Sequence, residues 1–201
     1  MILEENNDAA IRLAIKSLQL DNLIILPTDT IYGIAANAKS DIAVQKIYDI
    51  KKRNKNKAIA VFVKNIQEIE NNFYLNNLER KFITKYFPGA ATIILKPKKN
   101  KLSKFLNQND DSLAVRIPNH QFCLKLLEKF DDIMAVSSSN ISGMTAIRDI
   151  NLLQTKFGDK VDLIISGEFS KDYLASTIVK IEGKEVKVLR PGKIDIKPFP
   201  I

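Results

Sequence analysis

Short apolar runs alternate with amphipathic segments along most of the 201-residue chain. A short apolar run between polar or proline residues predicts a buried strand, and apolar residues three and four apart predict a helix. The strands predicted in this way are Leu23–Leu26, Ala58–Val63, Thr92–Leu95, Leu113–Ile117, Ile133–Val136, Val161–Ile165, Ser176–Ile181 and Glu185–Leu189. The predicted helices are Ala9–Leu20, Asp41–Lys52, Ile66–Asn72, Leu78–Phe87, Gln121–Phe130 and Asp149–Phe157.

The alternation of these elements predicts one α/β domain over residues 1–201, with a twisted mixed sheet and helices on its faces. Asp8 and Ser40 are the side chains expected to cap the first two helices. Glu182-Gly183-Lys184 separates the last two strands and is typical of a hairpin turn. We expect the core to span residues 8–193 and the tail, residues 194–201, to lie on the surface.

One long segment, Lys96–Asp111, shows no apolar period. Its lysines include Lys98, Lys99, Lys101 and Lys104. Because neither a helical nor a strand pattern is present, we predict a mobile surface loop there. A run of lysines of this kind is typical of a solvated face, and contact with RNA is the alternative.

The charge balance is basic, with a formal net charge of +8 and an isoelectric point near 9.4. Such a balance favours polyanionic partners, namely nucleotides, RNA or an anionic membrane surface, although a lysine-rich background composition explains it equally well. The single cysteine, Cys123, excludes an internal disulfide, which fits a reducing compartment. The sequence shows neither a secretory signal nor an apolar run near the roughly 18 residues of a membrane span, so we expect a cytoplasmic protein.

The single histidine, His120, limits the chemistry that the chain can perform. A metal site with two histidines is excluded, and a Ser-His-Asp triad would need His120 itself. We interpret His120 as a surface residue beside the N-cap of the helix Gln121–Phe130. Cys123 lies on the apolar stripe of that helix with Phe122 and Leu126, so we interpret it as a small core residue and not as a nucleophile.

Three polar stretches lie at the ends of predicted elements: Pro27–Gly33, Lys51–Arg53 and Ser138–Gly143. Each has an ordinary structural explanation: a Ser/Thr turn, cations at the C-terminal end of a helix, and a solvated turn, respectively. Loops at strand ends also carry chemistry. If the three stretches meet in space, their hydroxyl, amide and cationic groups form an anion-binding pocket without a histidine or a metal cluster.

Together with four further stretches, these three resemble the YrdC-like family in order and spacing, in particular its single-domain (TsaC-type) threonylcarbamoyl-AMP synthases. The seven matching stretches are Pro27–Ile34, Lys51–Arg53, Phe87–Thr92, Ala114–Pro118, Ser138–Gly143, Ser176–Val179 and Arg190–Gly192. The match extends over residues 10–193, which is nearly the whole chain. The resemblance implies a twisted α/β sheet with a concave, positively charged face.

The resemblance also implies a reaction: L-threonine, bicarbonate or CO2, and ATP give threonylcarbamoyl-AMP and pyrophosphate for the t6A modification of tRNA. The threonine amino group adds to CO2, and the carbamate oxygen then attacks the α-phosphorus of ATP. This chemistry needs positioning and charge neutralisation, not a protein nucleophile. Mg2+ would travel with the ATP phosphates, without ligands from the protein. The implied partners are tRNA or double-stranded RNA and the proteins of the downstream t6A transferase complex, with no membrane contact.

By the same resemblance, the functional residues fall into three groups. Lys51 and Arg53 are the implied catalytic cations, which neutralise charge on the phosphates and the carbamate. The implied nucleotide ligands are Lys51, Arg53, Lys57, Ser138, Asn140 and Arg190. The implied threonine ligands are Thr30, Arg116, Ser176 and Thr177. Of these, Arg116 would clamp the carboxylate with two parallel hydrogen bonds.

The sequence departs from the family pattern at several positions. Asn54, Ala58 and Ser137 replace prolines, which is expected to loosen the loops more than to change their chemistry. Phe62 stands where many members have histidine. Two alternatives to the synthase stay open: a non-catalytic, basic RNA-binding module of the same fold, and a paralogue with another carbamoylation role.

Overall fold

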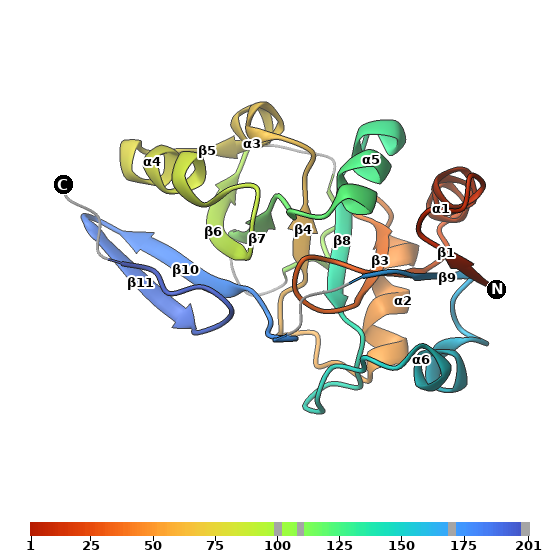
Figure 1. The fold of residues 1–201 in the computed structure, drawn as a ribbon. Coiled ribbons are helices and arrows are strands. Elements are labelled where there is room, and N and C mark those ends of the chain that lie inside the picture. Colours follow the sequence, from red (N-terminus) through yellow and green to blue (C-terminus); the bar gives the residue numbers. More distant parts are fainter. Residues whose placement is uncertain (99–101, 108–110, 169–171, 198–201) are drawn as a thin grey trace.

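The computed structural model describes residues 1–98, 102–107, 111–168 and 172–197. Its framework is one sheet in the order β1-β9-β2-β3-β8-β4-β7-β6-β10-β11, with β5 paired to β6 beside this path (Figure 1). The strands are β1 (Ile2–Glu4), β2 (Ile24–Leu26), β3 (Gly33–Asn37), β4 (Ala60–Phe62), β5 (Phe73–Tyr74), β6 (Ala91–Pro97), β7 (Leu113–Arg116), β8 (Met134–Ser138), β9 (Leu163–Ser166), β10 (Thr177–Glu182) and β11 (Glu185–Arg190). The helices are α1 (Ala10–Gln19), α2 (Asp41–Lys51), α3 (Ile66–Asn72), α4 (Asn77–Tyr86), α5 (Gln121–Phe130) and α6 (Ile150–Phe157).

The sheet is mixed, with both parallel and antiparallel strand pairs. β2 and β3 are antiparallel, whereas β9 lies parallel to both β1 and β2. In the other half, β4 lies parallel to β7 and β10 lies parallel to β6, and the β10–β11 hairpin forms the edge. The mixed α/β sheet and the late hairpin that the sequence predicts are therefore confirmed.

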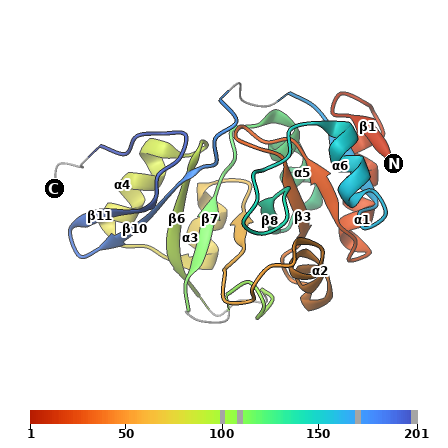
Figure 2. The same ribbon diagram turned by 90° about the horizontal axis from the view of Figure 1, so that it is seen from below.

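Two apolar cores lie on opposite faces of the sheet, because alternate residues of a strand point to opposite faces. The first core contains Ile25 and Val61 and includes side chains from α2, α3, α4 and α6. The second contains Ile24 and Phe62 and is covered by α1 and α5, which Figure 2 shows on the same half of the molecule as β8 and β3. On this second face, no helix of the described residues packs over β7, β6 and β10. The candidate site lies there.

The start of each of the first two helices tests a predicted cap. Ser40 Oγ accepts a hydrogen bond from the backbone nitrogen of Ala43 (3.1 Å), so the predicted cap of α2 is confirmed. The predicted cap of α1 is wrong, because Ala9 occupies the N-cap position and makes no side-chain bond. Asn7 and not Asp8 turns the chain there, since its Oδ1 accepts from the backbone nitrogen of Ala9 (2.9 Å).

Three strands, β1, β3 and β5, escape the sequence pattern. The most important is β3, because it begins inside a stretch predicted to be a loop and runs between β2 and β8. Its residues are small where it passes β8: a Cβ on Gly33 would lie 2.7 Å from Val136 Cγ1. Such small residues give little apolar signal, so the pattern of large hydrophobic residues misses the strand. β8 also extends to Ser138, further than predicted.

The predicted loop Lys96–Asp111 is packed against the protein over the part that is described. Its first two residues belong to β6. The backbone nitrogen of Ser103 donates to Ala38 O (2.8 Å), and Leu106 O accepts from the backbone nitrogen of Ile59 (2.9 Å). Leu106 is only 1% exposed and belongs to the first core, so a freely mobile loop is wrong for this part. The remaining predicted loop residues, 99–101 and 108–110, lie outside the described residues.

The described part of the tail after β11 packs against the protein and does not lie free on its surface. The backbone nitrogen of Lys193 donates to Ala175 O (2.8 Å). Ile194 and Ile196 pack against the first core, so the expectation of a tail lying wholly on the surface is wrong for these residues. In the same segment, Lys193 lies beside the turn between β2 and β3, where its Nζ donates to Asp29 O (2.9 Å).

Candidate active site

A small pocket of about 170 Å³ opens over β4, β7, β6 and β10, where no described helix covers the second face. Its lining combines hydroxyl groups, three arginines and an apolar floor. The hydroxyls include Thr28, Thr30, Thr92, Ser138 and Ser176, the arginines are Arg53, Arg116 and Arg190, and the floor includes Ala60, Phe62, Ala114, Val136 and Ile178. A concave, arginine-rich lining of this kind favours an anionic ligand that also offers hydrogen-bonding groups.

The first polar stretch forms the turn between β2 and β3. Thr28 Oγ1 donates to Ile31 O (2.7 Å) and accepts from the backbone nitrogen of Thr30 (3.0 Å), which is an ordinary Ser/Thr turn. The same geometry places the Oγ1 atoms of Thr28 and Thr30 2.9 Å apart in the pocket wall. The turn thus satisfies its own backbone and still presents two hydroxyl groups to the pocket.

Arg116, the last residue of β7, is held in the pocket wall by three hydrogen bonds. Nη2 donates to Asp29 Oδ1 (2.6 Å), Nη1 to Thr30 Oγ1 (3.0 Å) and Nε to Gly89 O (3.0 Å). The guanidinium also faces the ring of Phe62, with 5.4 Å from Cζ to the ring centroid. Arg116 is 3% exposed. Its cation is therefore fixed in position before any ligand binds.

Lys51, the last residue of α2, joins the second and third polar stretches. Its Nζ donates to Asn140 O (2.8 Å), to Asn140 Oδ1 (2.9 Å) and to the carbonyl oxygen of Ser138. Its own carbonyl accepts from the backbone nitrogen of Ser142 (2.9 Å). Lys51 is 1% exposed and lies outside the pocket lining. Burial, and secondly the charge of Arg53, lower the pKa of Lys51 to about 7, although the oxygen acceptors favour its charged form.

Arg53 reaches the pocket from the loop that leads from α2 to β4. Nη2 donates to Ala58 O (2.7 Å) and Nε to Lys57 O (3.0 Å). The Tyr48 hydroxyl donates to the same Lys57 carbonyl (3.1 Å) and so fixes this loop from its other side. Burial lowers the pKa of Arg53. Among the residues that the structure describes, no carboxylate pairs with Arg53.

The third polar stretch continues β8 to Ser138 and then turns. Ser138 Oγ donates to Asn140 Oδ1 (2.6 Å), and Asn140 Nδ2 donates to the carbonyl oxygen of Met144. Ser138 lines the pocket, whereas Asn140 is held inside its own loop and by Lys51. Because Ser138 also pairs with Gly33 across β3 and β8, the three polar stretches do meet in space.

Arg190, the last residue of β11, faces the pocket from the hairpin. Its Nη2 donates to Ser176 O (2.7 Å) and Oγ (3.3 Å), and Ser176 Oγ lies 2.8 Å from Thr92 Oγ1. Burial, then the charges of Arg116 and Arg53, lower the pKa of Arg190. Within the described residues, Arg116 alone of the three arginines has a carboxylate partner. The pocket therefore carries excess positive charge, which an anionic ligand would offset.

Besides Lys51 and Asn140, two more predicted ligands, Thr177 and Lys57, lie outside the pocket lining. Thr177 points to the opposite face of the sheet, because Ser176 and Ile178 on either side of it line the pocket. Its Oγ1 donates to Ile194 O (2.6 Å) and holds the tail. The side chain of Lys57 is exposed, and only its backbone carbonyl contacts Arg53. The structure does not bring these two side chains together with the other predicted ligands.

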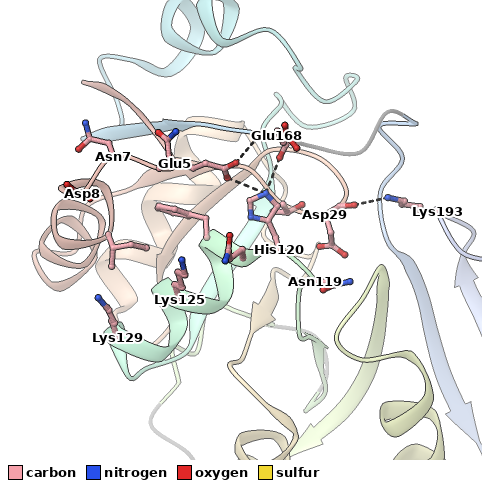
Figure 3. A pocket seen from close by; sticks show the side chains of 15 residues that line it. Glu5, Asn7, Asp8, Asp29, Asn119, His120, Lys125, Lys129, Glu168 and Lys193 are labelled. Atoms are coloured by element: carbon pink, nitrogen blue, oxygen red, sulfur yellow. Dashed lines mark hydrogen bonds and ion pairs between the residues drawn. The ribbon is translucent and has the colours of Figure 1, made fainter.

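His120 and Cys123 lie at the start of α5, on the other side of the turn between β2 and β3. Cys123 is buried and its Sγ lies 3.1 Å from Pro27 O; burial raises the pKa of its thiol, and its place in the second core confirms the prediction. His120 is the N-cap residue of α5, but it is not a free surface side chain. Its Nε2 lies 3.0 Å from Glu168 O and 3.5 Å from Glu5 Oε2, in the wall of a second cavity of about 860 Å³ (Figure 3).

Three residues were given no role from the sequence: Thr92, which lines the pocket, and Asp29 and Gly89, which hold Arg116. Asp29 and Thr92 lie inside stretches that match the family pattern, and an acid between two threonines is a signal for a cationic partner. Gly89 contributes a backbone carbonyl to Arg116, which no pattern of side chains reveals. Its position depends on the turn that follows α4.

The fold and the pocket together define the class of protein. The model of one family, Sua5/YciO/YrdC, described as telomere recombination, matches residues 16–192. The chain belongs to this family, which confirms the resemblance drawn from the seven stretches. None of the helices in the described part of the chain has the length and hydropathy of a membrane-spanning segment.

Relatives of known sequence carry one recurring name. A protein of Methanocaldococcus jannaschii named putative threonylcarbamoyl-AMP synthase is 33% identical over 96% of this chain and 91% of its own length. The threonylcarbamoyl-AMP synthase of Bacillus subtilis is 30% identical over 94% of this chain, which spans 55% of that relative. The longer relatives thus contain a large region that this chain does not match.

Two solved structures show the same fold. Pyrococcus abyssi Sua5 complexed with L-threonine is 26% identical, with a TM-score of 0.87 over 96% of this chain and 57% of that one. Escherichia coli YciO has a TM-score of 0.88 over 99% of this chain and 97% of that one. At 21% identity, YciO supports the fold alone.

Proposed function

We propose that this protein is an L-threonylcarbamoyladenylate synthase, a nucleotidyltransferase that forms threonylcarbamoyl-AMP and pyrophosphate from L-threonine, bicarbonate or CO2, and ATP. The observation that carries the proposal is the arrangement of Arg116, Arg53 and Arg190 around one hydroxyl-lined pocket. ATP carries several negative charges and L-threonine carries a carboxylate, so both offer anionic groups to these arginines. The family to which the chain belongs and the names of its relatives support the same reaction.

Threonine would bind at the Arg116 side of the pocket. Three of the five guanidinium N–H groups are already used by Asp29, Thr30 and Gly89, which leaves two for a carboxylate. The hydroxyls of Thr30 and Ser176 line the same wall and would pair with the threonine hydroxyl or amine. A site that pairs a substrate hydroxyl discriminates strongly against an analogue that lacks it.

ATP would bind with its phosphates towards Arg53 and Arg190 and its nucleoside near Ser138. Neither arginine has a carboxylate partner among the described residues, so both can offset phosphate charge. In the transition state, negative charge grows on the α-phosphate and the leaving pyrophosphate, where fixed cations are most effective. Lys51 would add charge from behind the Ser138–Asn140 loop, and that loop would be set by its three hydrogen bonds.

Mg2+ would arrive with ATP as part of the substrate. The described residues contain no group of three or more histidine, cysteine or acidic side chains that could hold a metal ion. The donor set of the pocket is hydroxyl and guanidinium, which suits phosphate better than a bare cation. Phosphate oxygens and water would therefore be the ligands of the ion, as is usual for this metal.

The product would serve the t6A modification of tRNA, so we propose that the protein works in the cytoplasm beside its tRNA and t6A transferase partners. The net charge of +8 is compatible with direct contact to tRNA or double-stranded RNA. A non-catalytic RNA-binding module and a paralogue with another carbamoylation role are the competing functions. One assay, pyrophosphate release from ATP, distinguishes these two functions from the synthase.

That assay is pyrophosphate release from MgATP by the purified protein. We expect release only when L-threonine and bicarbonate are both present, with threonylcarbamoyl-AMP formed in equal amount. L-Valine, which lacks the hydroxyl, serves as the matched amino-acid control. An RNA-binding module would release no pyrophosphate under any of these conditions. A paralogue would release it with a different carbamoyl donor or acceptor and independently of threonine.

A further inference from the structure

Asp29 lies between the two cavities of the molecule. Its carboxylate reaches Arg116 in the small pocket, and the residue also lines the cavity of about 860 Å³ on the other side of the turn (Figure 3). The side chain of Asp29 is 13% exposed and that of Arg116 is 4% exposed. No part of the proposed reaction needs a carboxylate at this place, so the pair needs its own explanation.

The contacts of Arg116 show what Asp29 does to it. A free arginine side chain has many rotamers, and fixing them on ligand binding reduces affinity. Here Asp29, Thr30 and Gly89 each accept one hydrogen bond, and Phe62 lies against one face of the guanidinium. Of the three acceptors, Asp29 alone is charged, so its bond is the strongest. Asp29 thus sets the direction in which the remaining N–H groups point.

The electrostatic effect of Asp29 has the opposite sign. A carboxylate beside Arg116 reduces the positive potential that an incoming anion experiences. A site that only collected negative charge would be better without it. Its presence at 2.6 Å from Nη2 therefore favours a ligand that must be held in one orientation over one that only has to be attracted.

The backbone of Asp29 is fixed as well. The Nζ of Lys193, from the tail, donates a hydrogen bond to Asp29 O (2.9 Å), and Figure 3 marks this bond between the tail and the turn that carries Asp29. The backbone nitrogen of Lys193 is bound to Ala175 O (2.8 Å), next to Ser176 of the pocket. The tail therefore connects the Asp29 turn to the wall that carries Ser176.

We propose that Asp29 is a positioning residue, which orients Arg116 for the carboxylate of L-threonine, and that Lys193 holds Asp29 in place for this purpose. The proposal rests on the proposed function, because it assigns the ligand of Arg116. It adds a residue and a tail segment that act through Arg116 without touching the substrate.

The test is Asp29→Asn, which keeps the shape and one acceptor oxygen but removes the charge. We expect the KM and the Kd for L-threonine to rise about tenfold, the effect of weakening one charge-assisted hydrogen bond, while the KM for ATP stays within about twofold. Binding of L-threoninamide, which has no carboxylate, should be the same in wild type and variant. The matched control is Asp8→Asn, since Asp8 lines the same large cavity and is exposed.

A second variant, Lys193→Met, leaves the three bonds of Arg116 in place and removes only the support of Asp29. We expect a smaller rise in the KM for L-threonine, about threefold, again without an effect on L-threoninamide. This variant tests the proposal even if Asp29→Asn does not fold. Equal losses for L-threonine and L-threoninamide in either variant, or an equal rise in the KM for ATP, would show that Asp29 serves the fold only.

The outcomes separate this inference from the proposed function. An active wild-type protein whose Asp29→Asn variant binds L-threonine unchanged overturns the role of Asp29 and leaves the synthase standing. A wild-type protein that binds L-threonine but releases no pyrophosphate overturns the synthase. The Kd values of wild type and variant for L-threonine and L-threoninamide then still decide the role of Asp29.

Discussion

The two ends of the pocket hold their cations in different ways. At the carboxylate end, defined by Arg116 and Thr30, the guanidinium is paired with Asp29 and buried. At the phosphate end, defined by Arg53 and Arg190, the guanidinium groups bond to backbone carbonyls and a hydroxyl, without a carboxylate among the described residues. The positive charge of Arg116 is therefore offset by a carboxylate and its side chain is fixed, whereas the positive charges of Arg53 and Arg190 are not offset within the described residues.

This difference matches the two proposed ligands. An amino acid carries a single carboxylate and must be placed so that its nitrogen meets CO2 and then the α-phosphorus, so orientation matters most. ATP brings several charges, so uncompensated cations are useful at its end. Removing a cation should therefore harm ATP use at one end, whereas at the other it should harm both threonine use and stability.

The largest effect is expected from Arg53→Ala at the phosphate end. Loss of one preorganised charge contact should lower kcat about a hundredfold or more. The matched control is Lys55→Ala, since Lys55 is exposed in the same loop and lies outside the pocket. Steady-state pyrophosphate release measures both variants. Equal rates for Arg53→Ala and wild type would remove Arg53 from the proposed machinery.

The next effect is expected from Arg116→Gln at the carboxylate end, and it concerns stability. The change leaves Asp29 largely buried without its cation, which should lower the free energy of unfolding by about 3 kcal/mol. Urea denaturation measures this loss. Combining Arg116→Gln with Asp29→Asn should restore part of it, because the unpaired charge is then gone. If the two losses simply add, the pair is not coupled and the contrast between the ends fails.

Lys51 gives a smaller effect that depends on pH. Its pKa in the folded protein is about 7, against an ordinary value of 10.5, so between these values the unfolded chain binds a proton that the folded protein does not. The contribution of Lys51 to the free energy of unfolding should therefore rise with pH across this window and be lowest below pH 7.

Urea denaturation at pH 7, 8 and 9 compares wild type with Lys51→Met, which cannot titrate. The wild type should gain stability relative to Lys51→Met as the pH rises. Lys55→Met is the control, because an exposed lysine in the same segment should leave the pH dependence of the wild type unchanged. Parallel pH profiles of wild type and Lys51→Met would contradict the lowered pKa.

The smallest effect is expected from Lys57→Ala. The sequence resemblance places Lys57 among the nucleotide ligands, but its side chain is exposed and does not line the pocket. We expect the KM for ATP to change less than about threefold, the range of a screened surface charge. A tenfold or larger rise in the KM for ATP would show that Lys57 contacts the ATP phosphates.

The sequence predicts the larger part of the fold, because large apolar residues mark most strands and helices. It predicts α3 and α5 with the bounds that the structure has. It misses β3, whose small residues leave no apolar signal, and the packing of Leu106 and Ile194, which depends on contacts between distant segments. Patterns of neighbouring residues cannot predict contacts of this kind.

The site is predicted in part. The resemblance selects Thr30, Arg116 and Ser176, and strand alternation then separates Ser176 from Thr177, which faces the other side of the sheet. That separation needs the strand register, which sequence motifs do not contain. The pairing of Asp29 with Arg116 joins residues far apart in the chain and likewise follows only from the fold.

The most direct test of the two-ended pocket is equilibrium binding of L-threonine and of MgATP to wild type, Arg53→Ala and Arg116→Gln, each first confirmed to be folded by circular dichroism. We expect Arg53→Ala to weaken MgATP binding at least tenfold and to leave the Kd for L-threonine within about twofold, and Arg116→Gln to do the reverse. Equal weakening of both ligands in both variants would contradict separate carboxylate and phosphate ends.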